Sequence, residues 1–157
     1  MDAIALRTLR SGERAPVLEV FAGLSERSRS LRFLGAKTRL LESDLVQLID
    51  VGRPGRQAVA AVDRETGLTV GIARYVRDAD APEAEIAFEV VDSWQGRGLG
   101  KRLVAELGER AREEGILRVR ALVAHGNRPA LALVRSLGDV LTRRYEDGSI
   151  ELVVRLA

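Results

Sequence analysis

The sequence predicts a single α/β (α+β) domain in which strands and helices contribute to one core. Three observations lead to this fold class. The chain has 157 residues, which is enough to bury a core and corresponds to one domain. Segments with the alternating apolar pattern of strands are interspersed with segments of helical periodicity. Hydrophobic residues make up 46% and charged residues 31%, without internal repeats or a linker, so we expect residues 1–157 to form one domain.

Strands are expected where apolar and polar residues alternate, and helices where apolar residues recur every three or four positions. In chain order, the expected elements are a strand over residues 3–9, helices over 14–22, 26–34 and 45–50, strands over 57–62, 68–76 and 83–91, a helix from 99 to Gly115, a strand over 116–123, a helix over 127–137, and strands over 140–145 and 150–156.

Turn and capping residues indicate where the N-terminal helices begin and end. Ser25 is a good N-cap for the second helix, and Gly35 is expected as its C′ glycine. Ser43 and Asp44 are expected to open the third helix, and the turn over residues 52–55 ends it.

The later elements are justified in the same way. Residues 63–67 are polar and connect the second and third strands as a hairpin loop. The long helix that follows the fourth strand has Glu106 and Arg110 paired at i,i+4 on its outer face. Its apolar face consists of Leu99, Leu103, Val104, Leu107 and Ala111. Residues 146–149 connect the two last strands as a terminal hairpin.

Composition excludes several classes of function. The chain has no cysteine, which excludes disulfides, thiolate metal sites and a cysteine nucleophile, and its single histidine, His125, excludes a histidine-cluster metal site. We therefore expect no metal. The net charge is only +2, the arginines are interspersed with acidic residues, and 4% of residues are aromatic, which argues against a nucleic-acid module.

Targeting signals are not expected. Asp2 lies where a signal peptide needs a basic residue, and no apolar run approaches the length of a membrane span. These observations predict a cytoplasmic location with no membrane partner.

The most informative motif lies between the fourth strand and the long helix. It reads Trp94-Gln95-Gly96-Arg97-Gly98-Leu99-Gly100-Lys101. Three glycines in five positions leave backbone N–H groups uncovered at the N-terminus of a helix, where aligned amides and the helix dipole bind anions. A dinucleotide fingerprint needs G-x-G-x-x-G and a P-loop needs G-x-x-x-x-G-K-[ST], and the motif matches neither. We therefore expect a phosphate-bearing cofactor of another kind.

The motif fits Q/R-x-x-G-x-G/A, the pyrophosphate loop of the GNAT family of N-acetyltransferases, and the chain resembles that family over nearly its whole length. The resemblance implies a mixed, mostly antiparallel sheet flanked by helices. It also implies that the fourth and fifth strands splay apart and that the pantetheine arm of acetyl-CoA lies in the gap. The cofactor-binding residues that it implies are Val90, Val91, Gln95, Gly96, Arg97, Gly98, Leu99, Gly100, Lys101 and Asn127.

Amide formation from a thioester requires an amine that has lost its proton, and an alkyl ammonium has a pKa of about 10.4. A positioned base raises the reactive fraction. Strand alternation puts Glu83, Glu85, Ala87 and Glu89 on one face of the fourth strand. The family commonly carries its base here, so Glu85 is the first choice and Glu89 the second. The alternative is a solvated polar face, and His125 is a further possible base.

The residues from Asn127 to Gly138 resemble the family pattern N-x-x-A-x-x-L-Y-x-x-x-G-F. The resemblance implies that Asn127 contacts the pantetheine arm, and the same side chain is a good N-cap. The tyrosine that many members use as a general acid falls on Val134, which has no proton to donate. No general acid is therefore assigned from this motif.

A narrower resemblance concerns residues 24–35, which are similar to the L-S-x-x-S-x-x-x-R-F-x-G segment of bacterial Pat-type protein lysine acetyltransferases. That group typically lacks the tyrosine as well, and its base falls on Glu85. The resemblance implies acetyl transfer to a protein lysine. A small-amine acetyltransferase and a non-catalytic acyl-CoA-sensing domain remain alternatives. The acyl preference, and whether the protein is a monomer or a homodimer, remain open.

Overall fold

The computed structural model describes residues 2–33 and 40–157. These residues contain one mixed sheet of seven strands. The strand order is β1-β2-β3-β4-β5-β7-β6, and all neighbours are antiparallel except β4 and β5. The strands are β1 (Ile4–Thr8), β2 (Arg56–Asp63), β3 (Thr69–Arg77), β4 (Glu83–Val90), β5 (Arg118–Ala124), β6 (Gly138–Glu146) and β7 (Ser149–Leu156). The expected α/β class and the mixed, mostly antiparallel sheet are confirmed.

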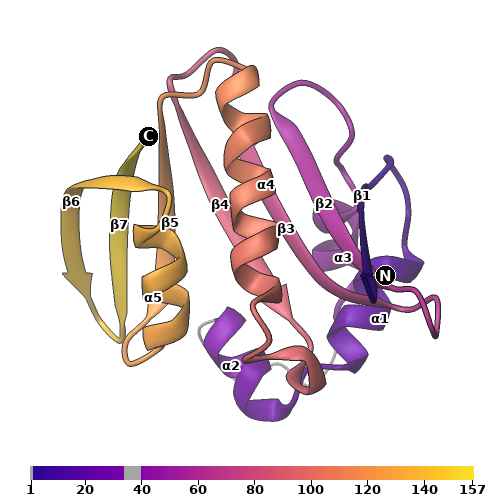
Figure 1. Cartoon of the computed structure of the whole chain (residues 1–157). Coiled ribbons are helices and arrows are strands. Elements are labelled where there is room, and N and C mark those ends of the chain that lie inside the picture. The colour runs from indigo at the N-terminus through magenta and orange to yellow at the C-terminus, as the bar shows by residue number, and fades with distance from the viewer. Residues whose placement is uncertain (1, 34–39) are drawn as a thin grey trace.

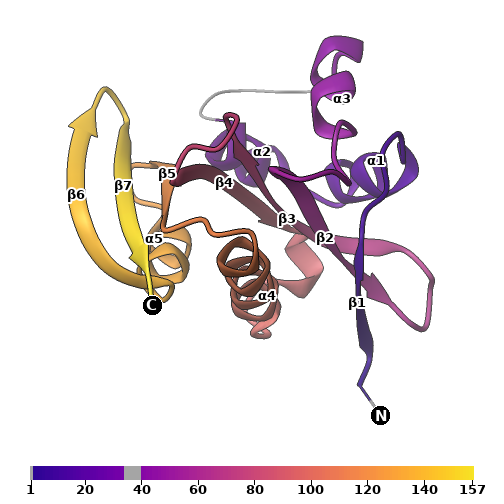
Figure 2. The same ribbon diagram turned by 90° about the horizontal axis from the view of Figure 1, so that it is seen from above.

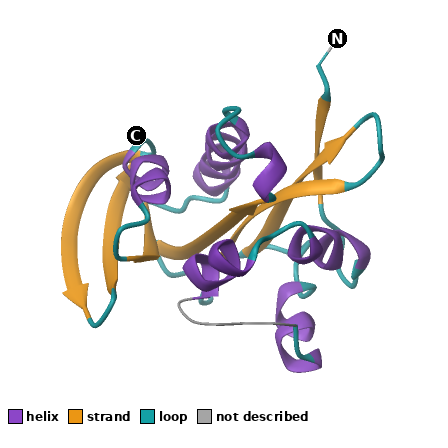
Figure 3. Ribbon diagram, turned by 90° about the horizontal axis from the view of Figure 1, so that it is seen from below, coloured by secondary structure: helices purple, strands orange, loops and turns teal. Residues whose placement is uncertain are grey.

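Helices cover both faces of this sheet (Figure 1). They are α1 (Ala15–Ala22), α2 (Glu26–Phe33), α3 (Glu42–Leu48), α4 (Leu99–Glu113) and α5 (Arg128–Arg135), with the 3-10 turn η1 (Asp92–Trp94) between β4 and α4. Figures 2 and 3 show α4 and α5 on one face and α1, α2 and α3 on the other. None of the helices in the described residues is long and apolar enough to cross a lipid bilayer.

The order of elements agrees with the sequence prediction, but some ends differ. Helix α3 begins at Glu42, with Leu41 as N-cap, and so starts three residues before the expected position. Asp44 lies inside the first turn, where its Oδ2 accepts a hydrogen bond from the Leu41 N–H at 2.9 Å. Ser25 is confirmed as the N-cap of α2, since its Oγ accepts from the Ser28 N–H at 3.1 Å. The expected end of α2 at residue 34 and the C′ glycine Gly35 lie outside the described residues.

The apolar face of α4 packs on the middle of the sheet. Its residues Leu103 and Leu107 are 0% and 1% exposed. Close approach to β3 depends on Gly71, because a β-carbon there would lie 2.8 Å from Leu103 Cδ1. Burial of each such leucine contributes about 1.5–3 kcal/mol. This packing fixes the position of the N-terminus of α4, which carries the expected phosphate loop.

Strands β4 and β5 pair over a short distance and then separate. The paired residues are Glu83 with Arg118, Ala84 with Val119, and Glu85 with Arg120. Beyond them β4 continues to Val90 on β3, while β5 continues to Ala124 on β7. The predicted splaying of the fourth and fifth strands is therefore confirmed. Glu85 lies at the point where they part.

Candidate active site

Two adjacent cavities, which share lining residues, occupy the region where β4 and β5 separate. The larger has a volume of about 720 Å³ and the smaller about 50 Å³. The larger is lined by the start of α2, by the end of β4 with the loop after it, and by the start of α5. The expected cofactor residues that line it are Val90, Gln95, Gly96, Gly98, Gly100, Lys101 and Asn127. Residues far apart in the sequence are thus brought together around one volume.

The loop before α4 has the form of an anion cradle. Gly96 and Gly98 have φ angles of +77° and +82°, in the left-handed region that favours glycine. A β-carbon at either position would meet no protein atom within 4 Å, so the space beside the loop is open. In the described part of the chain, the amides of Gly98, Leu99 and Lys101 have no protein acceptor, and the first bond runs from Arg102 N–H to Gly98 O at 3.2 Å. This arrangement fits a pyrophosphate.

Three expected cofactor residues do not line the cavity but support it. Val91 is 5% exposed, and its N–H donates to Val70 O at 2.9 Å. Leu99 is 3% exposed and belongs to the core side of α4. The guanidinium of Arg97 lies over the ring of Trp94, 4.5 Å from its centroid. These side chains hold the loop in its conformation.

Gln95 connects the loop to two other elements. Its Nε2 donates to Val90 O at 2.9 Å and to Ser28 Oγ at 3.4 Å. The side chain therefore joins the end of β4 to α2. The family motif contains this glutamine, but the sequence did not indicate either of these partners.

Asp92 is a functional-site residue that sequence reasoning missed. Its Oδ1 accepts from the Ser25 N–H at 3.0 Å, and its own N–H donates to Gly23 O at 3.1 Å. Partial burial acts to raise its pKa, but hydrogen bonds from Ser25 and Ser28 outweigh this and hold the pKa of Asp92 below its ordinary value. The N-cap signal of Ser25 was visible, but its distant carboxylate partner was not.

Glu85 is 61% exposed and forms an ion pair with Arg120, whose Nη2 lies 3.2 Å from Glu85 Oε2. The same guanidinium contacts Glu83 at 3.1 Å, and the hydrogen bond to Glu85 raises the pKa of Arg120. The residue after Glu85, Ile86, lines the smaller cavity, whereas Glu85 lines neither. Glu85 therefore lies at the border of the site.

Glu89, the second choice for the base, lines the larger cavity and is 9% exposed. Its Oε1 lies 3.5 Å from Arg74 Nη2, and Arg74 also donates to Leu48 O at 2.7 Å. The register between β3 and β4 is continuous through Glu89, so no bulge turns this side chain to the other face. Burial beside a guanidinium gives Glu89 a structural role that joins β3, β4 and α3.

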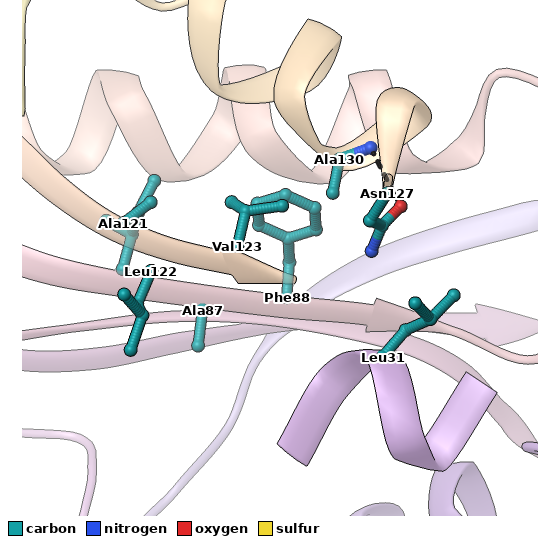
Figure 4. Close-up of a pocket in the computed structure, with 9 residues that line it drawn as sticks. Leu31, Ala87, Phe88, Ala121, Leu122, Val123, Asn127 and Ala130 are labelled. Carbon is teal, nitrogen blue, oxygen red and sulfur yellow. Dashed lines mark hydrogen bonds between the residues drawn. The ribbon is translucent and has the colours of Figure 1, made fainter. Parts of the chain in front are cut away.

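Asn127 caps α5, because its Oδ1 accepts from the Ala130 N–H at 3.4 Å (Figure 4). It also lines both cavities, which is compatible with a contact to the cofactor. Val134, at the tyrosine position of the family, is 0% exposed and packs in the core. His125 is exposed and lines neither cavity. In the described residues no three or more His, Asp or Glu side chains are grouped as metal ligands.

Comparison with known proteins agrees with this geometry. The model of the acetyltransferase (GNAT) family matches residues 27–139. The curated acetyltransferase PA5475 of Pseudomonas aeruginosa is 31% identical over 156 residues, which cover 98% of this chain and 83% of that protein.

Solved structures agree as well. The GNAT domain of S. lividans PAT superposes with a TM-score of 0.84 at 28% identity, over 96% of this chain and 89% of that one. The yncA protein of Salmonella typhimurium, a putative acetyltransferase solved with its cofactor acetyl-CoA, has the same fold, with a TM-score of 0.70 at 19% identity over 99% and 94% of the two chains. This chain belongs to the GNAT family of acetyltransferases.

Proposed function

We propose that this protein transfers the acetyl group of acetyl-CoA to a primary amine, with a protein lysine as the acceptor and Glu85 as general base, in the cytoplasm. One observation carries the proposal. The larger cavity runs from the uncovered amides of the glycine loop, residues 95–101 before and at the start of α4, to the gap between β4 and β5. Glu85 lies where this gap begins. The Pat-like segment supports the choice of acceptor, since Ser25, Ser28 and Leu31 line the cavity. The similarity to S. lividans PAT agrees with it.

Acetyl-CoA, when bound, would supply a thioester whose carbonyl a free amine attacks; the C–S bond breaks as the amide C–N bond forms, and the coenzyme leaves as a thiolate. The chain contributes the rest. The amides at the start of α4 hold the pyrophosphate, and the positive end of the helix dipole, with Lys101, favours its charge. Glu85 accepts a proton from the ammonium through water. Its ion pair with Arg120, at 3.2 Å, keeps the carboxylate oriented along the parting strands.

We do not assign a general acid to any hydroxyl group that lines the site. In the described lining, the hydroxyls belong to Ser25 and Ser28. Ser25 Oγ accepts from the Ser28 N–H, and Ser28 Oγ accepts from Gln95. Both side chains hold α2 in place. We therefore assign the protonation of the departing coenzyme thiolate to solvent.

The base assignment is tested with Glu85→Gln, with Glu83→Gln as the matched control. Glu83 lies on the same face and shares Arg120, at 3.1 Å. We expect Glu85→Gln to lower kcat by about 100-fold or more, since a general base contributes about 10²–10⁴. Its acetyl-CoA affinity should stay within twofold, and the acidic limb of its pH–rate profile should disappear. A wild-type pH profile in Glu85→Gln would show that the base is another group.

The acceptor is tested by release of thiol from acetyl-CoA with cell extract separated into protein and small-molecule fractions. The chain has no cysteine and adds no thiol of its own, and the protein fraction is first treated to block its thiols. Release that needs the protein fraction supports a protein lysine. Release with the small fraction alone indicates a metabolite acetyltransferase.

A non-catalytic acyl-CoA sensor is the second candidate, favoured by the buried Val134 at the position of the usual acid. It predicts binding of acetyl-CoA without turnover by either fraction.

A further inference from the structure

The chain carries its positive charge almost entirely on arginine. Of its 25 lysine and arginine residues, only Lys37 and Lys101 are lysine. Lys37 lies outside the described residues, so Lys101 is the one lysine in the part of the chain that the structure describes. A lysine amine is a nucleophile once it has lost its proton, whereas a guanidinium stays protonated in proteins. The position of Lys101 therefore shows where this part of the protein can be acylated on a side-chain nitrogen.

Lys101 is exposed and lines the larger cavity from the first turn of α4. The uncovered amides of the glycine loop in the described chain belong to Gly98, Leu99 and Lys101 itself. Among the described residues no carboxylate lies within ion-pair distance of Lys101, whereas its neighbour Arg102 pairs with Asp2 at 2.8 Å. A cation at the positive end of a helix is unfavourable unless an anion lies beside it. The ammonium and the amides are therefore suited to the same anion.

A coenzyme bound as proposed above keeps its thioester away from Lys101. Its pyrophosphate lies at the start of α4, and its thioester lies in the gap between β4 and β5. This gap opens from strand pairs beside the other end of α4, where Leu117 N–H donates to Pro82 O at 2.8 Å (Figure 1). The 15 residues of α4 span about 22 Å. A donor that acylates Lys101 must therefore carry its acyl group close to the phosphate.

We propose that Lys101 is a site of self-acylation by acyl phosphates and that its acylation weakens coenzyme binding. The inference rests on the proposed function in one respect, because it takes the glycine loop as the phosphate site. It does not depend on Glu85 or on the acceptor. The acyl phosphate binds with its phosphate on the loop amides, where the ammonium of Lys101 pairs with a phosphate oxygen. The acyl carbon is bonded to an oxygen of the same phosphate and so lies within reach of Lys101 Nζ.

The reaction transfers the acyl group from oxygen to nitrogen. Lys101 loses a proton to solvent, and the lone pair of its Nζ attacks the acyl carbon. The C–N bond forms as the C–O bond to the phosphate breaks, and inorganic phosphate leaves with the electron pair of that bond. The amides at the start of α4 stabilise the charge that develops on the leaving oxygen. The products are an N-acylated Lys101 and inorganic phosphate.

Acylation removes the charge of Lys101 and adds an amide where the coenzyme pyrophosphate binds. A hydrogen bond to a charged group contributes enough to change an affinity by about tenfold or more. We therefore expect the acylated protein to bind acetyl-CoA at least tenfold more weakly than the unmodified protein. A bound coenzyme in turn covers the loop and protects Lys101. Acyl phosphate and coenzyme thus compete for one site.

The first experiment compares Lys101 with Lys37 in the same protein by peptide mass spectrometry. The protein is treated either with acetyl phosphate or with the N-hydroxysuccinimide ester of acetic acid, which has no phosphate. The ester measures the ordinary reactivity of the two amines and so corrects for any difference in their exposure. We expect acetyl phosphate to favour Lys101 over Lys37 at least tenfold more than the ester does. Equal preferences for the two reagents would overturn the proposal.

Two further measurements locate the donor on the glycine loop. Coenzyme A, which has the pyrophosphate but no acyl group, should protect Lys101 from acetyl phosphate and leave Lys37 unprotected. Gly98→Val fills the open space beside the loop and should lower the preference for Lys101 to that of the ester. Gly67→Val, at an equally open glycine of the β2–β3 loop, should leave the preference unchanged. A preference for Lys101 that survives both coenzyme A and Gly98→Val would show that the phosphate binds elsewhere.

Calorimetric titration with acetyl-CoA measures the consequence of acylation. Wild type should lose affinity in proportion to the acetylation of Lys101, reaching at least tenfold when the site is fully modified. Lys101→Arg cannot be acylated there, so treatment with acetyl phosphate should leave its own affinity unchanged. Full acetylation of Lys101 without loss of affinity would contradict the effect on coenzyme binding.

The proposed function is judged separately, by transfer of acetyl groups to an acceptor. Turnover without selective acylation of Lys101 would overturn this inference and leave the function intact. Selective acylation of Lys101 in a protein that turns over no acceptor would support the inference and contradict the function.

Discussion

Two features of Gly98 have separate consequences for a substitution: its left-handed backbone conformation and the open space beside its Cα. Its φ of +82° favours glycine, and the space beside its Cα contains no protein atom within 4 Å. A side chain here would therefore carry backbone strain and would also occupy the volume next to the uncovered amides. Strain lowers stability, whereas occupation of this volume lowers affinity. The two effects can be measured separately.

We predict that Gly98→Ala lowers the free energy of unfolding by about 1–2 kcal/mol, the cost of the left-handed conformation for a residue with a β-carbon. Acetyl-CoA affinity should fall at least tenfold. Gly67→Ala is the control, since Gly67 has a φ of +76° and equally open space but lies in the β2–β3 loop. It should show the same loss in urea unfolding and unchanged calorimetric binding. Equal affinities of the two variants would rule out a phosphate contact at Gly98.

Asn127 combines a cap and a cavity position in one side chain. Asn127→Ala removes the acceptor of the Ala130 N–H and should destabilise the protein by about 1 kcal/mol. Asn127→Ser keeps a capping oxygen and should restore most of this loss. If the amide also contacts the coenzyme, both variants should raise the KM for acetyl-CoA severalfold. Recovery of KM in Asn127→Ser would indicate that the cap alone explains the residue.

At the scale of elements, a joint between η1 and the start of α2 connects the two sides of the cavity. The bonds from Ser25 to Asp92 and from Gln95 to Ser28 each span 67 positions of the sequence. A close contact adds to them, because a β-carbon on Gly23 would lie 2.5 Å from Val91 Cγ1. The position of α2, which carries part of the lining, is thereby coupled to the glycine loop.

This joint should contribute to stability in a pH-dependent way. The pKa of Asp92 in the folded protein lies below its ordinary value of 3.8. The unfolded state therefore binds the proton more readily, and the contribution is present above about pH 4 and lost as the pH falls through the lower, folded pKa. Asp92→Asn keeps an oxygen acceptor for Ser25 but has no charge. The difference in unfolding free energy between wild type and Asp92→Asn should be constant from pH 7 to 5 and shrink below pH 4.

Urea unfolding at a series of pH values measures this difference. Other carboxylates with lowered pKa values, such as Glu13 and Glu42, are present in both proteins and cancel. Asp80→Asn, at an exposed loop position, is measured alongside as the control for the removal of one carboxylate. A difference that persists unchanged to pH 3 would exclude the charge of Asp92 as its source.

The contacts between η1 and α2 also show which parts of the site could be predicted from the sequence and which could not. The glycine loop was predictable because its residues are neighbours in the chain, and their spacing has a direct physical meaning. The cap by Ser25 was local in the same sense. Two contacts could not be predicted in this way: the hydrogen bond from Ser25 to Asp92, and the ion pair of Glu85 with Arg120. Each depends on strand order and register, which no local pattern specifies. The start of α3 was misplaced because Asp44 acts from within the first turn rather than before it.

At the scale of the whole molecule, ligand binding should appear as thermal stability. A ligand present at 100 times its dissociation constant stabilises the folded state by about 2.7 kcal/mol. For a domain of 157 residues this corresponds to a rise in Tm of about 5–11 °C. Differential scanning fluorimetry with acetyl-CoA should show this shift, and Gly98→Val should abolish it. A normal shift in Gly98→Val would mean that the coenzyme binds elsewhere.

The short pairing between β4 and β5 also makes the sheet mechanically uneven. Three residue pairs, Glu83–Arg118, Ala84–Val119 and Glu85–Arg120, form the whole ladder between its two halves. Every other pair of neighbouring strands is joined over at least five residues. We expect a small rotation of one half against the other about this junction to change the width of the gap while the longer ladders stay intact. The shortest ladder of the sheet therefore lies beside the candidate site.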